Sequence, residues 1–162
     1  MSLRSKRPMS AAGLTDGYGR SLALDNSAWA RVLDGRITGI PRLRYDAAVR
    51  ADELMVADPF RLEALYSARD GAAFEELRRH LGGFRHAQGT SRTWPRAIDL
   101  QRQLAEDRRI SHRVKLADLL LAACAEEAGA GILHYDHDYD VLAGHTDLDA
   151  ESVWITPRGS VD

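Results

Sequence analysis

The segment VKLADLLLAACAEEAGAGILHYDHDYDVLA, residues 114–143, shows the clearest structural pattern in the chain. Its first part is almost entirely apolar and ends at Gly129, which predicts a buried helix with a glycine stop. The apolar run AGILHY at 130–135 then predicts a buried strand, and 136–143 predict a helix or a turn. A buried helix that leads into a buried strand is typical of a domain built around a parallel sheet.

The rest of the chain shows the same alternation. Short apolar runs predict strands, and apolar residues at helical spacing predict the helices between them. The helix after the first strand should begin at an N-cap formed by Asn26 or Ser27. The helices expected at 72–84 and 94–109 could pair as a helical hairpin. The other expected elements are strands at 21–25, 55–58 and 152–156 and helices at 26–35, 42–54 and 58–69.

Composition restricts the classes of protein that the chain can belong to. Its 162 residues, 44% of them hydrophobic, are enough for one domain with its own core. The single cysteine, Cys124, excludes a disulfide within the chain and predicts a small buried side chain in a reducing compartment. No apolar run is long enough to span a membrane, so we expect a cytoplasmic protein. A net charge of −2 argues against nonspecific wrapping of nucleic acid.

The N-terminal residues differ in character from those that follow. Residues 1–19 are basic and aperiodic and contain serine and glycine, which predicts a flexible basic extension. The alternating pattern then predicts a single folded domain at 20–159, followed by a short C-terminal tail at 160–162.

Carboxylates gather where the first and third expected strands end. Asp25 follows one strand and Asp136 the other, and carboxyl ends of parallel strands meet at one edge of a sheet, where ligands bind. Asp138 and Asp140 crowd the second of these ends, since they follow Asp136 at every second position. A bound cation, nearby basic side chains or exposure to water could each offset their repulsion. We expect Asp140 to be solvated or to begin a helix, without a metal role.

Two further acids lie on expected helices. Asp118 interrupts the apolar run LADLLLAACA, and a lone buried carboxylate is costly unless it is paired or bound to metal. A salt bridge to Arg113 or Lys115, or the helix dipole, would be a purely structural explanation. Glu63, in FRLEALY, could equally lie on the exposed side of its helix. Acids on four separated elements nevertheless favour a site for Mg²⁺ or Mn²⁺, which fits phosphodiester hydrolysis.

The sequence resembles the PIN-domain nucleases and, within them, the VapC toxins of bacterial toxin–antitoxin pairs. Four pieces show the resemblance in order across residues 21 to 159, and the third is the most specific. They are LALDNSAW (22–29), PFRLEALYSAR (59–69), HRVKLADLLLAACAEEAGAGILHYDHDYDVLA (112–143) and WITPRGS (154–160).

The resemblance implies a PIN-like three-layer α/β/α fold with a short central parallel sheet. It also implies RNA cleavage that needs Mg²⁺ or Mn²⁺, a homodimer, and a small VapB-type antitoxin that covers the site. The residues that it assigns to the acidic pocket are Asp25, Glu63, Asp118 and Asp136, with Asp138 as an auxiliary ligand and Ser27 orienting a carboxylate or a water.

Other interpretations fit parts of the pattern. A noncatalytic α/β protein could hold a structural cation at these acids, and a phosphohydrolase could use them on small phosphorylated molecules. A zinc site would have to use His134, His137 and His145, which have no cysteine beside them. His112 or Arg113 could position RNA phosphate, or could lie in a solvated loop.

Overall fold

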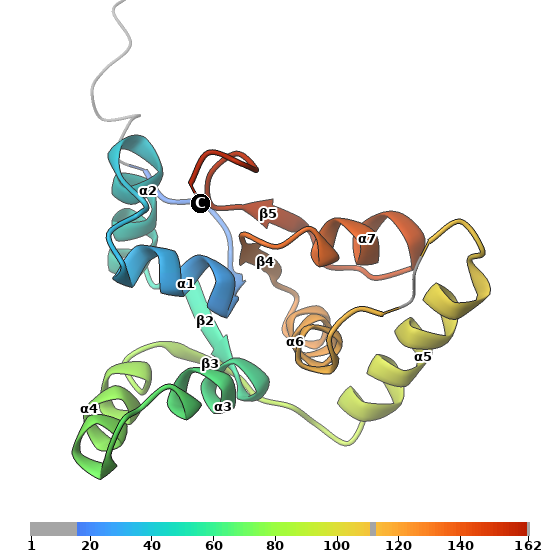
Figure 1. Ribbon diagram of the computed structural model, residues 1–162, viewed down its shortest axis with the longest axis horizontal. Helices are drawn as coiled ribbons and strands as arrows, with labels where there is room; N and C mark the ends of the chain where they lie inside the picture. Colours follow the sequence, from blue (N-terminus) through green and yellow to red (C-terminus); the bar gives the residue numbers. More distant parts are fainter. Residues whose placement is uncertain (1–15, 111–112, 162) are drawn as a thin grey trace, which may run out of the picture.

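The computed structural model describes residues 16–110 and 113–161 (Figure 1). Most of the expected N-terminal extension at 1–19, the last residue of the expected tail and His112 therefore lie outside the described residues. The proposed division into extension, domain and tail stays a prediction. Among the described residues, no helix is long and apolar enough to cross a membrane.

Five short strands of the described chain form one sheet, and all of their pairings are parallel. The middle strands are buried along their whole length, as apolar runs covered by helices on both faces must be. The short central parallel sheet is thus confirmed. In spatial order the strands are β3 (Arg85–Ala87), β2 (Leu54–Ala57), β1 (Leu22–Leu24), β4 (Gly131–His134) and β5 (Ser152–Trp154).

Helices cover both faces of this sheet and complete a three-layer α/β/α arrangement (Figure 1). The apolar helix at 116–127 contacts four of the strands and buries most of its side chains, including Cys124, as its sequence predicts. The helices of the described residues are α1 (Asn26–Leu33), α2 (Gly39–Arg50), α3 (Asp58–Tyr66), α4 (Gly71–Leu81), α5 (Thr93–Glu106), α6 (Leu116–Glu127) and α7 (Asp138–His145).

The expected hairpin between the helices at 72–84 and 94–109 is wrong. Strand β3 lies between them and pairs with β2 at the edge of the sheet, so the chain carries α5 away from α4. Helix α4 packs against α3, whereas α5 packs against α6 (Figure 1). The strand was not predicted because Arg85 and His86 are exposed and only Ala87 is buried, which leaves no apolar run.

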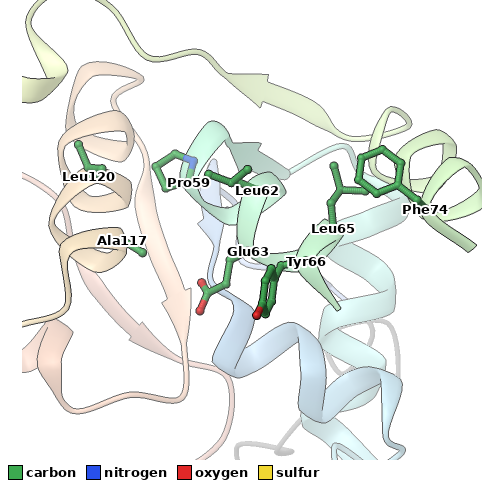
Figure 2. Close-up of a pocket in the computed structure, with 8 residues that line it drawn as sticks. All are labelled: Pro59, Leu62, Glu63, Leu65, Tyr66, Phe74, Ala117 and Leu120. Carbon is green, nitrogen blue, oxygen red and sulfur yellow. The ribbon is translucent and has the colours of Figure 1, made fainter. Parts of the chain in front are cut away.

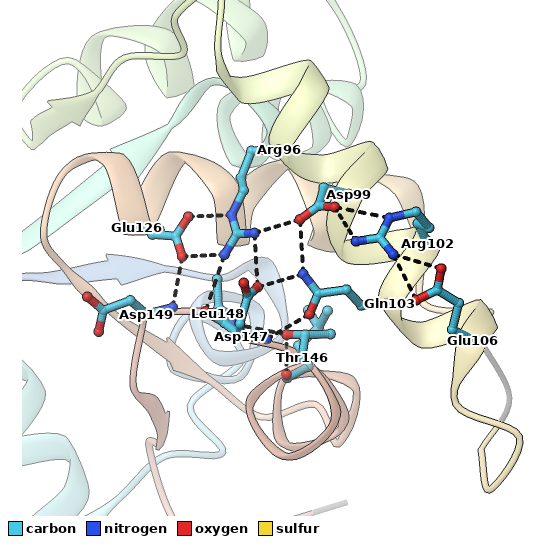
Figure 3. Close-up of polar contacts among 11 residues, drawn as sticks. Arg96, Asp99, Arg102, Gln103, Glu106, Glu126, Thr146, Asp147, Leu148 and Asp149 are labelled. Atoms are coloured by element: carbon cyan, nitrogen blue, oxygen red, sulfur yellow. Dashed lines mark hydrogen bonds and ion pairs between the residues drawn. The ribbon is translucent and has the colours of Figure 1, made fainter.

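An ion-pair network fixes α5 to α6 and to the segment after α7 (Figure 3). Arg96 on α5 donates two hydrogen bonds to the Glu126 carboxylate on α6, at 2.6 and 2.8 Å. Its guanidinium also lies 2.9 Å from Asp99 and 3.0 Å from Asp147. Because the Arg96 and Glu126 side chains are only 21% and 20% exposed, this pair is better shielded from water than the surface pairs around it.

We expect Arg96→Met to lower the free energy of unfolding by about 2–3 kcal/mol, since the half-buried Glu126 would lose a charged hydrogen-bond partner. Arg102→Met is the matched control on the same helix, because the pairs of Arg102 with Asp99 and Glu106 are exposed and should contribute less than about 1 kcal/mol. Chemical denaturation of both variants measures the difference. Equal losses in the free energy of unfolding would mean that the ion pairs of Arg96 stabilise the fold no more than the exposed pairs of Arg102.

Candidate active site

Asp25, at the carboxyl end of β1, is buried and begins α1. Its backbone is extended, so its carboxylate accepts a hydrogen bond of 2.8 Å from the backbone N–H of Ser27. The expected N-cap of Asn26 or Ser27 is therefore wrong by one or two residues, because the cap is Asp25 itself. The Ser27 hydroxyl donates to the same carboxylate oxygen and accepts from the Tyr135 N–H at 2.9 Å, which ties α1 to the end of β4.

Tyr139 connects two of the acids and was not predicted as a site residue. Its side chain is 1% exposed, and its hydroxyl lies 2.7 Å from Asp25 Oδ1 and 3.3 Å from Asp118 Oδ1. Burial, together with the charges of Asp25 and Asp118, raises the pKa of Tyr139 well above its ordinary value. The phenol consequently stays protonated and acts as a hydrogen-bond donor toward the carboxylates. In the sequence, only its position within the acidic run DHDYD could have indicated that Tyr139 belongs to the site.

Asp118 on α6 is the least satisfied acid of the site. It is 5% exposed, and its Oδ2 atom is buried without a hydrogen-bond partner among the described residues. The Lys115 ammonium lies 4.0 Å from that oxygen, so the salt bridge considered from the sequence is only partly formed. Burial first, and then the charge of Asp25, raise the pKa of Asp118 to about 7 despite the opposing effect of Lys115.

Asp136 and Asp138 complete a cluster with Asp118. One carboxylate oxygen from each of the three residues lies within 4.8 Å of the others. Burial favours the neutral form of Asp136, but hydrogen bonds from the Asp138 N–H at 3.0 Å and from Lys115 at 2.8 Å lower its pKa overall. Burial and the charge of Asp136 raise the pKa of Asp138. Such an arrangement of oxygen atoms could hold a divalent cation.

Glu63 reaches the same place from α3. Its carboxylate projects toward the start of α1, away from the apolar side chains of Leu62 and Leu65 (Figure 2). Burial first, and then the charge of Asp25, raise the pKa of Glu63. The structure thus brings the predicted acids of four elements together around a cavity of about 150 Å³, which we call the acidic cavity. It is lined by Asp25, Asn26, Ser27, Glu63, Lys115, Asp118 and Asp136.

Asp140 lies in the first turn of α7, which confirms one of its two expected roles, but its side chain is not simply solvated. Its carboxylate accepts hydrogen bonds from the Ser152 hydroxyl at 2.7 Å and from the Trp154 indole at 3.0 Å, so it fixes α7 to β5. The histidines considered for zinc have partners of their own. His134 is fully buried 2.7 Å from the Ser152 hydroxyl, and His145 lies 2.9 Å from Asp107.

A parallel α/β/α sheet with acids converging at its carboxyl edge is the architecture of a PIN domain, and the model of the PIN domain family matches residues 22–145. The chain therefore belongs to the PIN domain family. Within that family it is a VapC-type member.

Two relatives support this assignment. The chain is 37% identical over 139 residues to Ribonuclease VapC18 of Mycobacterium tuberculosis, an alignment that covers 85% of this chain and 97% of that protein. It is 39% identical over 101 residues to Ribonuclease VapC51 of the same organism, covering 62% and 71% of the two chains.

Solved structures share the fold as well. The crystal structure of DNA-bound VapBC from Salmonella typhimurium matches with a TM-score of 0.65 at 12% identity, covering 85% of this chain and 99% of that chain. At such low identity the likeness shows the fold alone.

Proposed function

We propose that the protein is an endoribonuclease toxin that requires a divalent cation and is neutralised by a cognate VapB-type antitoxin. The observation that carries the proposal is the orphaned Asp118 oxygen beside Asp136 and Asp138, because a buried charge of this kind needs a cation. The VapC ribonucleases that resemble the chain over most of its length support RNA as the substrate. We infer the antitoxin from the VapC names of these relatives, since the structure that shares the fold is a VapBC complex.

The donor set fits Mg²⁺ or Mn²⁺. Oxygen ligands alone favour hard cations, and the cluster offers one oxygen each from Asp118, Asp136 and Asp138. When bound, such a cation would neutralise charge on a phosphoryl group and make a water more acidic. Lys115 already places one positive charge here, 2.8 Å from Asp136 and 4.0 Å from Asp118. That ammonium only partly compensates the acids, so room for further positive charge remains.

The chain's own residues position the reaction around this cluster. Ser27 and Tyr139 hold the Asp25 carboxylate from two sides, so its negative charge stays fixed toward the acidic cavity. We assign Glu63 the role of accepting a proton from the attacking water at its carboxylate, because it is the cavity's most exposed acid. Lys115 is suited to contact a phosphate oxygen once its hold on Asp136 is loosened.

An apolar groove beside the acidic cavity fits the antitoxin. It has a volume of about 660 Å³ and shares Glu63 with the cavity (Figure 2). We propose that an apolar helix of the antitoxin lies in this groove and sends an Arg or Lys to the acids. A structure of the complex with the partner's segment far from Glu63 would contradict this. The groove is lined by Pro59, Leu62, Glu63, Leu65, Tyr66, Phe74, Ala117 and Leu120. We also propose that the chain forms a homodimer. Sedimentation of the purified chain in the analytical ultracentrifuge measures its mass in solution and tests this.

The direct test of the function is cleavage of RNA by the purified chain. We expect cleavage of total cellular RNA with Mg²⁺ or Mn²⁺, no cleavage with excess EDTA, and recovery when the metal is restored. Millimolar Mn²⁺ should also raise the melting temperature, because the cation binds the folded chain and has no comparable site in the unfolded one. Unchanged melting together with intact RNA would favour the noncatalytic binding protein.

A further inference from the structure

A second hollow of about 480 Å³ adjoins the acidic cavity and shares Ser27, Lys115 and Asp136 with it. Its remaining wall differs in charge. The acidic cavity has four carboxylates and one lysine, whereas this hollow has Asp136 alone against several basic side chains. We call it the basic pocket; the residues that it does not share with the cavity are Arg31, Tyr135, His137, Trp154, Arg158 and Gly159.

Arg31 is held in place at this pocket. Its guanidinium lies over the Tyr135 ring, 4.2 Å from the centroid, and its Nη1 donates to the backbone oxygen of Ser27 at 3.0 Å. Its Nε points to the carbonyl of Val161 at 3.5 Å. These contacts fix the plane of the guanidinium and leave its Nη2 group without a partner within residues 16–110 and 113–161. A fixed guanidinium with unused N–H groups is suited to a phosphate oxygen.

Arg158 projects from an ordered turn after β5. Ser160 closes this turn, since its N–H donates to the Pro157 carbonyl at 3.1 Å and its hydroxyl lies 3.0 Å from that of Thr156. Gly159 adopts a φ of +75°, which a residue with a side chain would rarely tolerate. Arg158 itself is exposed and has no ion pair or hydrogen bond to any other described residue. Within the described part of the chain it is therefore an unpaired cation at the rim of the basic pocket.

We propose that the basic pocket binds the phosphate next to the scissile one in single-stranded RNA, through Arg31 and Arg158. The inference rests on the proposed ribonuclease function. A scissile phosphate can share the cation at the acids, but its neighbour along the strand would be repelled by them and needs positive charge of its own. Trp154 is fixed by its bond to Asp140 and leaves part of its indole in the pocket, where an unstacked base could contact it.

Binding measurements test this without relying on cleavage. The probe is a short fluorescent single-stranded RNA with Mg²⁺, and the protein is the full chain carrying Asp118→Asn so that the RNA stays intact. Adding Arg158→Gln should weaken binding about tenfold. It should also reduce the slope of log affinity against log salt by about 0.7, the value for one lost phosphate contact on a single strand. Arg158→Lys should keep most of the slope.

Arg79→Gln is the matched control, because Arg79 is an exposed arginine on α4, far from the C-terminal turn (Figure 1). It should change neither affinity nor slope. Unchanged affinity and slope in Arg158→Gln would overturn the proposal. The proposal would also be overturned if Arg158→Gln weakened binding of the antitoxin and left RNA binding unchanged. That result would assign the basic pocket to an acidic peptide segment. If the expected binding pattern appears but the wild-type chain cleaves no RNA, the pocket stands and the proposed ribonuclease function fails.

Discussion

Replacing Asp118 by Asn should lower single-turnover cleavage of RNA at least ~10²-fold, which is the scale of losing one electrostatic stabiliser in a preorganised site. The change keeps the shape of the side chain and removes its charge. Because Asp118 is buried and one of its oxygens accepts no hydrogen bond from residues 16–110 or 113–161, the amide should fit without disturbing α6. Asp138→Asn should have an intermediate effect, since Asp138 is a more exposed member of the cluster.

The same substitution should stabilise the metal-free chain at pH 8. Burial raises the pKa of Asp118 to about 7, above its unfolded value, so the folded state binds this proton more tightly. The stability linked to this group is therefore present at low pH and is lost as the pH rises from about 4 through 7. The advantage of Asp118→Asn over the wild type should be largest at pH 8 and should shrink toward pH 5. Thermal melting in EDTA at both pH values measures it.

Asp149→Asn is the proper control for these experiments. Asp149 is exposed, and its carboxylate has no hydrogen bond or ion pair to another described residue. Asp140, which would have served if it were only solvated, is unsuitable because it fixes α7 to β5. If Asp118→Asn is folded and cleaves RNA as fast as Asp149→Asn, the acidic cavity is not the nuclease site.

The fold was predictable where burial covers whole elements. Continuous apolar runs marked β4 and α6. The strand is covered on both faces, and the helix is packed between the sheet and its neighbours α3 and α5, so neither has a wide solvated face to interrupt the pattern. The same logic fails at the sheet edge, where Arg85 and His86 of β3 face solvent. Missing that strand led directly to the wrong pairing of α4 with α5.

The site was predictable as a set of acids but not as a network. Strand ends and an acid within an apolar helix are visible in the sequence, and they pointed to Asp25, Asp136 and Asp118. The hydrogen bond from Tyr139 to Asp25 spans 114 residues, so it depends on where the fold places α7 relative to the end of β1, which no local pattern encodes. Lys115 pairs more closely with Asp136, at 2.8 Å, than with Asp118, at 4.0 Å. This preference also depends on where the ammonium lies in the folded chain, which the sequence does not show.

Asp25→Asn should also lower RNA cleavage at least ~10²-fold, and here the reason lies in both charge and position. Asparagine is as good an N-cap as aspartate, and its oxygen can keep the bonds from Ser27, so α1 should remain folded. The negative charge beside Asp118 would be lost, and the apparent affinity for Mn²⁺ should fall with it.

Tyr139→Phe separates these two contributions, because it keeps the Asp25 charge and removes only the hydroxyl that orients it. Its cleavage rate should fall about tenfold through misplacement of the carboxylates, with a smaller change in Mn²⁺ affinity than in Asp25→Asn. Metal titrations and single-turnover rates of both variants, beside Asp149→Asn, make the comparison. A folded Asp25→Asn chain that binds Mn²⁺ and cleaves RNA like the wild type would remove Asp25 from the site and leave Asp118, Asp136 and Asp138 to hold the cation.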